Sequence, residues 1–397
     1  MSSPQPDDQS TIVEEYKLWR KNSRYMYNYI SETALVWPSL SFQFFPLHTF
    51  QNKQQDTESA ITHNIALSTF TSESDKEYWK VGSLQLPKDT KQKRLTSDEL
   101  VGINSRLKIS KKFEQSSEIN RIRVNPIDSN VIGTINAKGE VKVYQLNEKM
   151  EADSTIELIH HEQNGFGLSW NPHDSKELLT GSEDKTCALW DYSKPKSPVR
   201  IWDASASIND IRWVNLQESM FGSVSEDKKF YYGDTRTNGC IFNDVLNGVV
   251  FNSLCFSTHS ANLVAFGGDD SNVYLYDLRM LDRGLHTMMG HSGSITNIEW
   301  DPWHENVIGS SSLDRRVILW DISKIGEEQL PEEMEDGVPE LLMMHGGHTG
   351  GVNDFAFNKN IEWCLGSCSD DNIVHVWVVD EKAVKDHTDE VDYTLLE

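Results

Sequence analysis

Apolar and polar residues alternate along short segments that recur through most of the chain. Each unit begins with an apolar stretch such as "DIRW" or "NIEW", continues through a turn and a stretch of small residues such as "FGSVS", and ends as in "CALWD". Alternation of this kind over about four to eight residues is typical of half-buried β-strands. The pattern therefore predicts an all-β protein built from repeated units.

The aromatic position near the end of each unit shows the length of the repeat. It is occupied by Tyr144, Trp190, Gly233, Tyr276, Trp320 and Trp377, and neighbouring positions are 43 to 46 residues apart except for the last pair, at 57. Blades of WD-repeat propellers contain about 40–45 residues. Six units over residues 107–379 and a seventh over 63–87 predict a seven-bladed WD-repeat β-propeller that spans 39–379.

Within this propeller, we expect residues 39–45 to join the last blade and close the ring, which removes exposed sheet edges. "GH" dipeptides at His291 and His348 complete the WD-repeat signature, and Asp314 and Asp371 follow small-residue strands. We interpret these histidines as structural hydrogen-bonding groups. No metal site and no cofactor is predicted.

Residues 12–31 are predicted to form an N-terminal α-helix, preceded by a flexible segment over 1–11. Thr11 and Glu14 have the spacing of a capping box. Two apolar stripes follow at helical spacing, with Ile12, Tyr16, Trp19, Met26 and Ile30 on the first and Leu18, Tyr25 and Tyr29 on the second. The second stripe either belongs to one broad buried face or meets a partner, and the periodicity leaves both readings open.

The long final interval of the repeat comes from an acidic insertion over residues 325–342. Its segment "EEMEDGVPELL" has five acidic residues and no lysine or arginine. Such a loop is either a solvated surface segment or a receptor for a basic partner. If the N-terminal helix packs beside it, helix and loop form two walls of one groove.

The whole chain is acidic, with a formal net charge of −24, which disfavours direct contact with nucleic acid or anionic membranes and favours basic partners. Five cysteines without a CxxC pair or a secretory signal indicate buried free thiols in the cytoplasm or nucleus. No apolar run reaches membrane-spanning length. The sequence contains no phosphate-binding, zinc-protease or serine-hydrolase motif, so we predict that it is not an enzyme. Residues 380–397 form an acidic C-terminal tail.

Five segments carry a family resemblance: "EEYKLWRKN", "WPSLSFQFFP", "INRIRVNP", "GFGLSWNP" and "KIGEEQLPEEMEDGVPELLMMHGGHTGGVNDFAF". They resemble the histone-chaperone WD-repeat family of retinoblastoma-binding proteins, over nearly the whole chain. Within that family, "SINDIRW", "GSVSED" and "NVYLYDLR" look most like the fungal second subunit of the type B histone acetyltransferase.

The resemblance implies a non-catalytic propeller that clamps the first helix of histone H-four between the N-terminal helix and the acidic loop, and presents it to a catalytic acetyltransferase subunit. The matching helix positions are Leu18, Tyr25, Met26 and Tyr29. The matching loop positions are Glu332, Glu333, Glu335, Asp336, Leu341 and Leu342. On this view the acidic loop is a receptor for histone arginines and lysines.

The resemblance also implies a second pocket, on the top face, for the basic tail of histone H-three. Glu118, Asn120, Arg121 and Asp370 match that pocket. Val36, Asn164, Asn209 and Ser294 stand where several relatives carry glutamate, and Phe166 replaces a tyrosine. Fewer carboxylates predict weaker capture of a cationic tail.

Two other functions fit parts of the pattern. Sister proteins in chromatin-assembly or deacetylase complexes share the same groove. "GDTR" at 234–237 and "YDLR" at 276–279 resemble the endings of ubiquitin-ligase substrate receptors, a reading that leaves the helix and the acidic loop unexplained.

Overall fold

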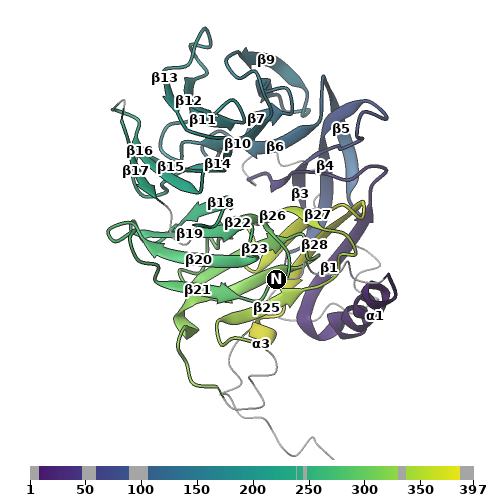
Figure 1. Ribbon diagram of the computed structural model, residues 1–397. Helices are drawn as coiled ribbons and strands as arrows, with labels where there is room; N and C mark the ends of the chain where they lie inside the picture. Colours follow the sequence, from purple (N-terminus) through teal and green to yellow (C-terminus); the bar gives the residue numbers. More distant parts are fainter. Residues whose placement is uncertain are drawn as a thin grey trace, which may run out of the picture.

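Seven antiparallel sheets of four strands each surround a common centre in the computed structural model of the chain (Figure 1). The structure describes residues 9–46, 60–88, 106–237, 239–244, 248–329 and 337–384. This arrangement confirms the prediction of a seven-bladed propeller.

The first four blades run in sequence order. They consist of β2 (Phe42–Phe44), β3 (Ala60–Ser68), β4 (Glu77–Pro87) and β5 (Lys108–Gln115); β6 (Ile119–Val124), β7 (Val131–Asn136), β8 (Val141–Leu146) and β9 (Ala152–Leu158); β10 (Gly165–Trp170), β11 (Glu177–Ser182), β12 (Thr186–Asp191) and β13 (Arg200–Asp203); and β14 (Ile208–Trp213), β15 (Met220–Ser225), β16 (Lys229–Asp234) and β17 (Cys240–Asp244).

The last three blades follow the same pattern, except at the end of the ring. They consist of β18 (Phe251–Phe256), β19 (Leu263–Gly268), β20 (Asn272–Asp277) and β21 (His286–Met289); β22 (Ile295–Trp300), β23 (Val307–Ser312), β24 (Val317–Asp321) and β25 (Leu341–His345); and β26 (Val352–Phe357), β27 (Cys364–Ser369), β28 (Ile373–Val379) and β1 (Tyr27–Ala34). Two short elements are η2 (Ile322–Lys324) and α3 (Glu381–Val384).

The ring is closed by β1, which pairs antiparallel with β28 as the outer strand of the seventh blade. The expectation that residues 39–45 would join the last blade is therefore wrong, since β2 pairs with β3 in the first blade. The segment that closes the ring is one that the sequence assigned to the helix.

The N-terminal helix α1 covers Gln9–Met26, so the predicted span 12–31 and the flexible segment 1–11 both had wrong boundaries. Thr11 lies inside the helix and does not cap it. From Tyr27 onward, alternate residues are buried, which is the period of a strand. The tyrosines of "YMYNYI" fit either period, and pairing with β28 decides for the strand because it satisfies the backbone hydrogen-bonding groups.

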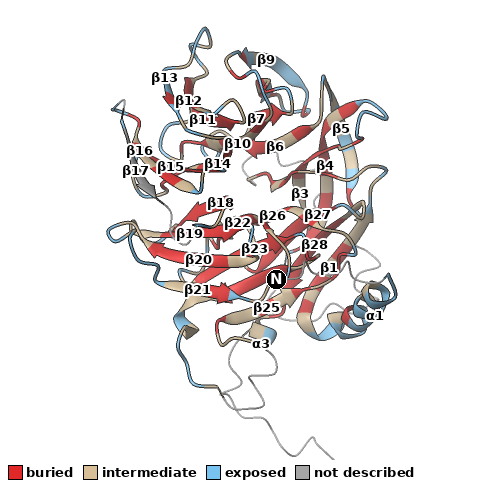
Figure 2. Cartoon of the chain, in the orientation of Figure 1, coloured by how far each residue is buried: buried red, intermediate tan, exposed pale blue. Residues whose placement is uncertain are grey.

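The core lies between neighbouring blades, where small residues allow close approach. Figure 2 shows buried residues concentrated in the strands and exposed residues along much of α1. A Cβ atom added at Gly181 would lie 2.5 Å from Ile208 Cγ2 of the next blade, and one at Gly366 would lie 2.2 Å from Phe42 Cζ. The second contact joins the last blade to the first, so packing as well as strand pairing closes the ring.

The repeated histidines are structural, as predicted. In blade six, His291 bridges Asp314 and Ser310 at 2.8 Å each, and Trp320 Nε1 donates to the same serine hydroxyl at 2.8 Å. In blade seven, His348 bridges Asp371 and Ser367. Four of the five cysteines, Cys187, Cys255, Cys364 and Cys368, are buried and free, and the side chain of Cys240 lies outside the described residues.

Candidate partner-binding site

The helix α1 is attached to the seventh blade through Trp19, the one buried residue of the helix. Its Nε1–H donates to the hydroxyl of Tyr27 at 3.1 Å, and its ring stacks on His375 with centroids 5.8 Å apart. Gly347 passes beneath the indole, where a Cβ atom would lie 2.6 Å from Trp19 Cζ2. The helix is therefore held by an aromatic anchor in a close-fitting socket.

A relay of hydrogen bonds continues from this anchor into the blade. Because the Tyr27 hydroxyl accepts from Trp19, its proton is available to His345 Nδ1, 2.7 Å away. His345 then carries its proton on Nε2, which faces His375 Nδ1 at 2.9 Å. Burial lowers the pKa of both His345 and His375 well below the usual value, so both rings are neutral at pH 7.

These histidines form the one cluster within the described residues whose geometry could suit a metal ion, namely His345, His348 and His375. Their nitrogens are already engaged, however. His345 bonds to Tyr27 and His375, and His348 bonds to Asp371 and Ser367. The cluster is best described as the socket for α1.

Two charged contacts fix the direction of α1. Glu15 pairs with Arg315 at 3.0 Å and with Arg316 at 3.6 Å, both on the turn between β23 and β24. On another side, Arg20 and Tyr16 reach Glu32 on β1. The helix is thus tied to both the sixth and the seventh blade.

A cleft of about 330 Å³ remains between α1 and these two blades. The helix contributes one wall of mainly apolar side chains, and the blades contribute a mixed wall. The lining residues include Ile12, Tyr16, Leu18, Trp19 and Met26 from the helix, and Asp314, Arg315, Arg316, Met344 and His348 from the blades. The cleft can accept an apolar side chain that faces a polar rim.

Of the helix residues predicted to bind, Leu18 and Met26 line this cleft. Leu18 is 61% exposed and Tyr25 is 51% exposed, so both are large apolar groups presented to solvent. The prediction for Tyr29 is wrong. It lies on β1, is 2% exposed and packs among Phe42, Leu84 and Leu86, because the chain has already become a strand there.

The loop residues divide into two groups. Glu332, Glu333, Glu335 and Asp336 lie outside the described residues. Leu341 and Leu342 are half-buried at the start of β25 and pack against core clusters, so the predicted loop 325–342 ends before its stated boundary. Glu340 is buried and bonds to His286 Nε2 at 2.6 Å, which fastens the end of the insertion to blade five.

The four residues predicted for a top-face pocket have different surroundings. Asp370 is exposed and accepts from Asn353 at 2.8 Å, while Glu118 is half-buried. Asn120 donates to Asn164 Oδ1 at 2.5 Å. The Arg121 side chain is only 12% exposed and lies 4.0 Å from Asp210, and burial lowers its pKa to about 10. Arg121 therefore belongs to the channel wall and offers little surface to a ligand.

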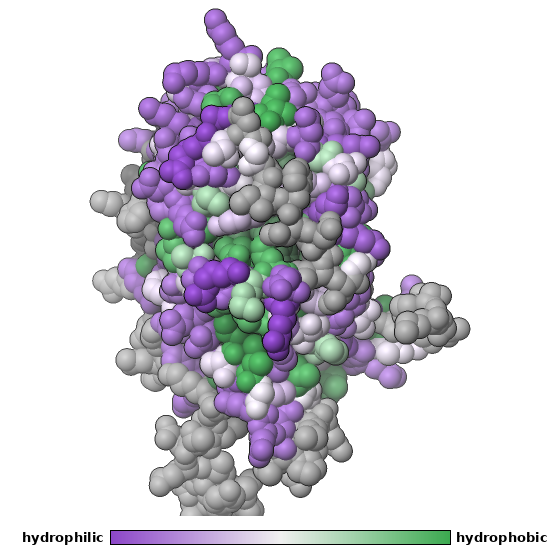
Figure 3. Space-filling model, turned by 60° about the vertical axis from the view of Figure 1, so that its left-hand side comes forward, coloured by the Kyte–Doolittle hydropathy of each residue, from purple (hydrophilic) through white to green (hydrophobic). Residues whose placement is uncertain are grey.

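Exposed apolar side chains also occur away from α1. Figure 3 shows another face of the molecule, largely hydrophilic, with apolar side chains gathered near its centre. Met280, Leu285 and Met289 of blade five are exposed as well. Exposure alone does not identify a site, and what distinguishes the helix is the hollow beside it.

Comparison with known proteins agrees with this geometry. Residues 14–88, which include most of α1, match the family of histone-binding protein RBBP4 and its counterpart in the CAF1 complex. Residues 154–191, 283–321 and 339–378 match "WD domain, G-beta repeat". The chain is 44% identical to histone acetyltransferase type B subunit 2 of Debaryomyces hansenii, with 93% of this chain and 91% of the relative covered.

The chain belongs to the histone acetyltransferase type B subunit 2 family. The relative of the same name in Candida albicans is 41% identical and is covered over the full length of both chains. The one in Candida glabrata is 38% identical, with 94% of this chain and 90% of the relative covered. Among the helices that the structure describes, none combines the length and the apolar composition of a membrane span.

Sequence reasoning about this family member missed most of the socket. Trp19 had been placed on the first apolar stripe, but its partners Tyr27, His345 and His375 come from distant parts of the chain. No local signal pairs them. A charged residue with a partner on another element, such as Glu15 with Arg315, is equally invisible to periodicity.

Proposed function

We propose that this chain is the non-catalytic, histone-binding subunit of a type B histone acetyltransferase complex. In this proposal it binds the first helix of histone H-four in the cleft beside α1. The observation that carries the proposal is the cleft itself, of about 330 Å³, with Leu18 and Met26 on one wall and the start of β25 close to the other. The family that residues 14–88 match supports a histone as the ligand.

An amphipathic helix is the partner that suits such a groove. Apolar anchors at helical spacing enter the cleft, and polar residues meet the rim. The two arginines on the described wall, Arg315 and Arg316, are paired with Glu15, so that wall does not repel a basic helix strongly. We assign the attraction to Glu332, Glu333, Glu335 and Asp336, and to the net charge of −24.

The subunit would hold histone H-four while a separate catalytic subunit transfers the acetyl group, in the cytoplasm and nucleus, on newly made histone. No step of catalysis is assigned to this chain. The motif Asp277–Arg279 fits a ubiquitin-ligase receptor less well, because Arg279 is paired with its own aspartate at 2.6 Å. The arginine of the other motif, Arg236, is paired with Asp234 in the same way.

A sister role in a chromatin-assembly or deacetylase complex would use the same groove. The two roles differ in which proteins accompany the chain. Purification of the tagged protein from its source cells, with mass spectrometry of its partners, decides between them. An acetyltransferase as the main partner supports the proposal, and an assembly factor or deacetylase in its place contradicts it.

The groove is tested by titrating a peptide that covers the first helix of histone H-four, at low and high ionic strength. Leu18→Ala with Tyr25→Ala removes apolar contact, so binding should weaken at both ionic strengths. Glu333→Lys with Asp336→Lys reverses charge, so binding should weaken most at low salt. A matched control, Met280→Ala with Leu285→Ala, removes exposed apolar groups from blade five.

The expected result is weaker binding by the first two double variants and unchanged binding by the control. Equal binding by all four proteins would place the groove elsewhere. For the role in catalysis, addition of this subunit to a separate catalytic subunit should raise acetylation of full histone H-four more than of a short tail peptide. Acetyl transfer by the isolated chain would contradict a non-catalytic role.

A further inference from the structure

The central channel of the propeller opens into a pocket of about 200 Å³ at the end where the first strand of each blade finishes. All seven blades contribute to it. One lining residue from each is Phe44, Val124, Trp170, Trp213, Phe256, Trp300 and Phe357. This pocket shares no lining residue with the cleft beside α1.

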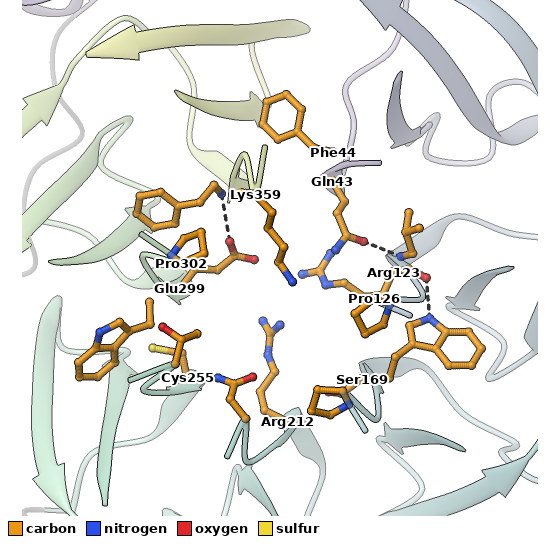
Figure 4. Close-up of a pocket in the computed structure, with 18 of the residues that line it drawn as sticks. Gln43, Phe44, Arg123, Pro126, Ser169, Arg212, Cys255, Glu299, Pro302 and Lys359 are labelled. Carbon is orange, nitrogen blue, oxygen red and sulfur yellow. Dashed lines mark hydrogen bonds between the residues drawn. The ribbon is translucent and has the colours of Figure 1, made fainter. Parts of the chain in front are cut away.

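Three cationic side chains converge on this pocket from three blades. Figure 4 shows Arg123, Arg212 and Lys359 pointing toward its centre, with the carboxylate of Glu299 at the side. Such convergence is unusual for a chain with a net charge of −24. Cations gathered in a partly enclosed space repel one another unless an anion is close to them.

The two arginines have different tasks. Arg212 is held by the protein, since its Nε donates to Asp210 at 3.1 Å and its Nη2 to Asn297 at 3.0 Å. Arg123 is held through Nη1 alone, which donates to the Ser41 hydroxyl, the Ile122 carbonyl and the Asp354 carboxylate at 2.9–3.2 Å.

The other edge of the Arg123 guanidinium is unused. Its Nε and Nη2 are buried, and neither has a hydrogen-bond partner among the residues that the structure describes. The side chain is only 6% exposed. Nε–H and Nη2–H lie side by side on the same edge of the group, which is the geometry that binds two oxygens of a carboxylate or phosphate.

The nearby acidic groups do not use this edge. Asp354 already balances Arg123, and Asp210 balances Arg212. Glu299 accepts from the backbone N–H of Phe357 at 3.2 Å, and burial raises the pKa of its carboxyl group. Lys359 is exposed, and no ion pair to it occurs within the described part of the chain. The pocket therefore retains positive charge.

We propose that this end of the channel binds a small oxyanion. Two of its oxygens accept from Nε and Nη2 of Arg123, and its remaining charge faces Lys359. The ligand class is a phosphoryl or carboxylate group, which a free anion or the C-terminal carboxylate of a peptide can supply. Binding here is independent of the groove beside α1, so this site stands whether or not the groove binds histone.

The test is calorimetric titration of the full chain with inorganic phosphate, at ionic strength kept constant with chloride. Lys359→Glu places a negative charge at the pocket and is exposed, so it should fold normally. Lys176→Glu is the matched control, because it makes the same change in the equivalent turn of blade three, outside the pocket. We expect saturable binding that Lys359→Ala weakens about tenfold and Lys359→Glu abolishes.

A second variant addresses the arginine edge. Arg123→Lys keeps the charge but removes the paired donors, so it should lose phosphate binding while circular dichroism confirms the fold. In a parallel titration, a short peptide with a free C-terminal carboxylate is compared with its C-terminal amide. Binding of the acid form alone identifies a peptide terminus as a ligand, and binding of phosphate alone identifies a free anion. If neither probe binds saturably, or if Lys359→Glu binds like the control, the proposal is wrong.

Discussion

Trp19 donates a hydrogen bond from its indole Nε1 to the hydroxyl of Tyr27 at 3.1 Å, across the junction where α1 becomes β1. One residue belongs to the helix that lines the candidate groove, and the other belongs to the strand that closes the propeller ring. The position of the groove wall therefore depends on ring closure, and three predictions follow from the contacts around this bond and around the closure.

Replacing Trp19 by alanine should detach α1 from the blade. Large-to-small changes at buried tryptophans cost about 3–5 kcal/mol, and here the loss falls mainly on the helix because the blade core is otherwise intact. Hydrogen exchange should show α1 amides losing protection while the blade strands keep theirs. Leu18→Ala is the control, since Leu18 is exposed and should change stability by less than about 0.5 kcal/mol.

Acid should destabilise the socket of α1. The pKa of His345 and of His375 is lowered in the folded protein by burial, so the unfolded chain binds protons more readily than the folded one. Stability is then fully present above pH ~6.5, the usual histidine value, and is lost as pH falls below it, by up to about 1.4 kcal/mol per pH unit for each histidine.

The measurement is thermal unfolding at several pH values between 7.5 and 5, together with hydrogen exchange of α1. His375→Gln retains a hydrogen-bonding group but cannot titrate, so its stability should fall less steeply with acid. An identical pH dependence in His375→Gln would mean that this ring does not contribute.

Asp354→Asn should destabilise the whole ring. Asp354 of blade seven accepts from the Ser41 hydroxyl, the Phe42 N–H and Arg123 through one oxygen, and from Asn297 at 2.7 Å through the other. Removing one partner of a buried ion pair costs about 3–5 kcal/mol. Denaturant unfolding should show this loss, whereas Asp282→Asn, at an exposed position with the same charge change, should be nearly neutral.

The top face can be tested by restoring a carboxylate. Asn164 accepts from Asn120 through its side-chain oxygen, and a glutamate at this position keeps an acceptor there. Asn164→Glu should strengthen binding of a histone H-three tail peptide by up to about 1 kcal/mol at low salt, as expected for a partly exposed charge pair. Fluorescence anisotropy with the labelled peptide measures it, and Asp370→Asn should act in the opposite direction. Tight binding by the unmodified chain that is insensitive to Asp370→Asn would contradict this account of the pocket.

The sequence by itself determined the repeat, the number of blades and the roles of His291 and His348, because these depend on patterns that recur within each unit. It also marked α1 as a helix with an exposed apolar side, at Leu18 and Tyr25. Tertiary structure alone decided where α1 ends, since the tyrosines after Met26 suit a helix or a strand and only the free edge of β28 selects the strand. It also brought Trp19 to His375 and Arg123 to Lys359, because such partners meet only when a ring of seven blades closes and places distant residues side by side.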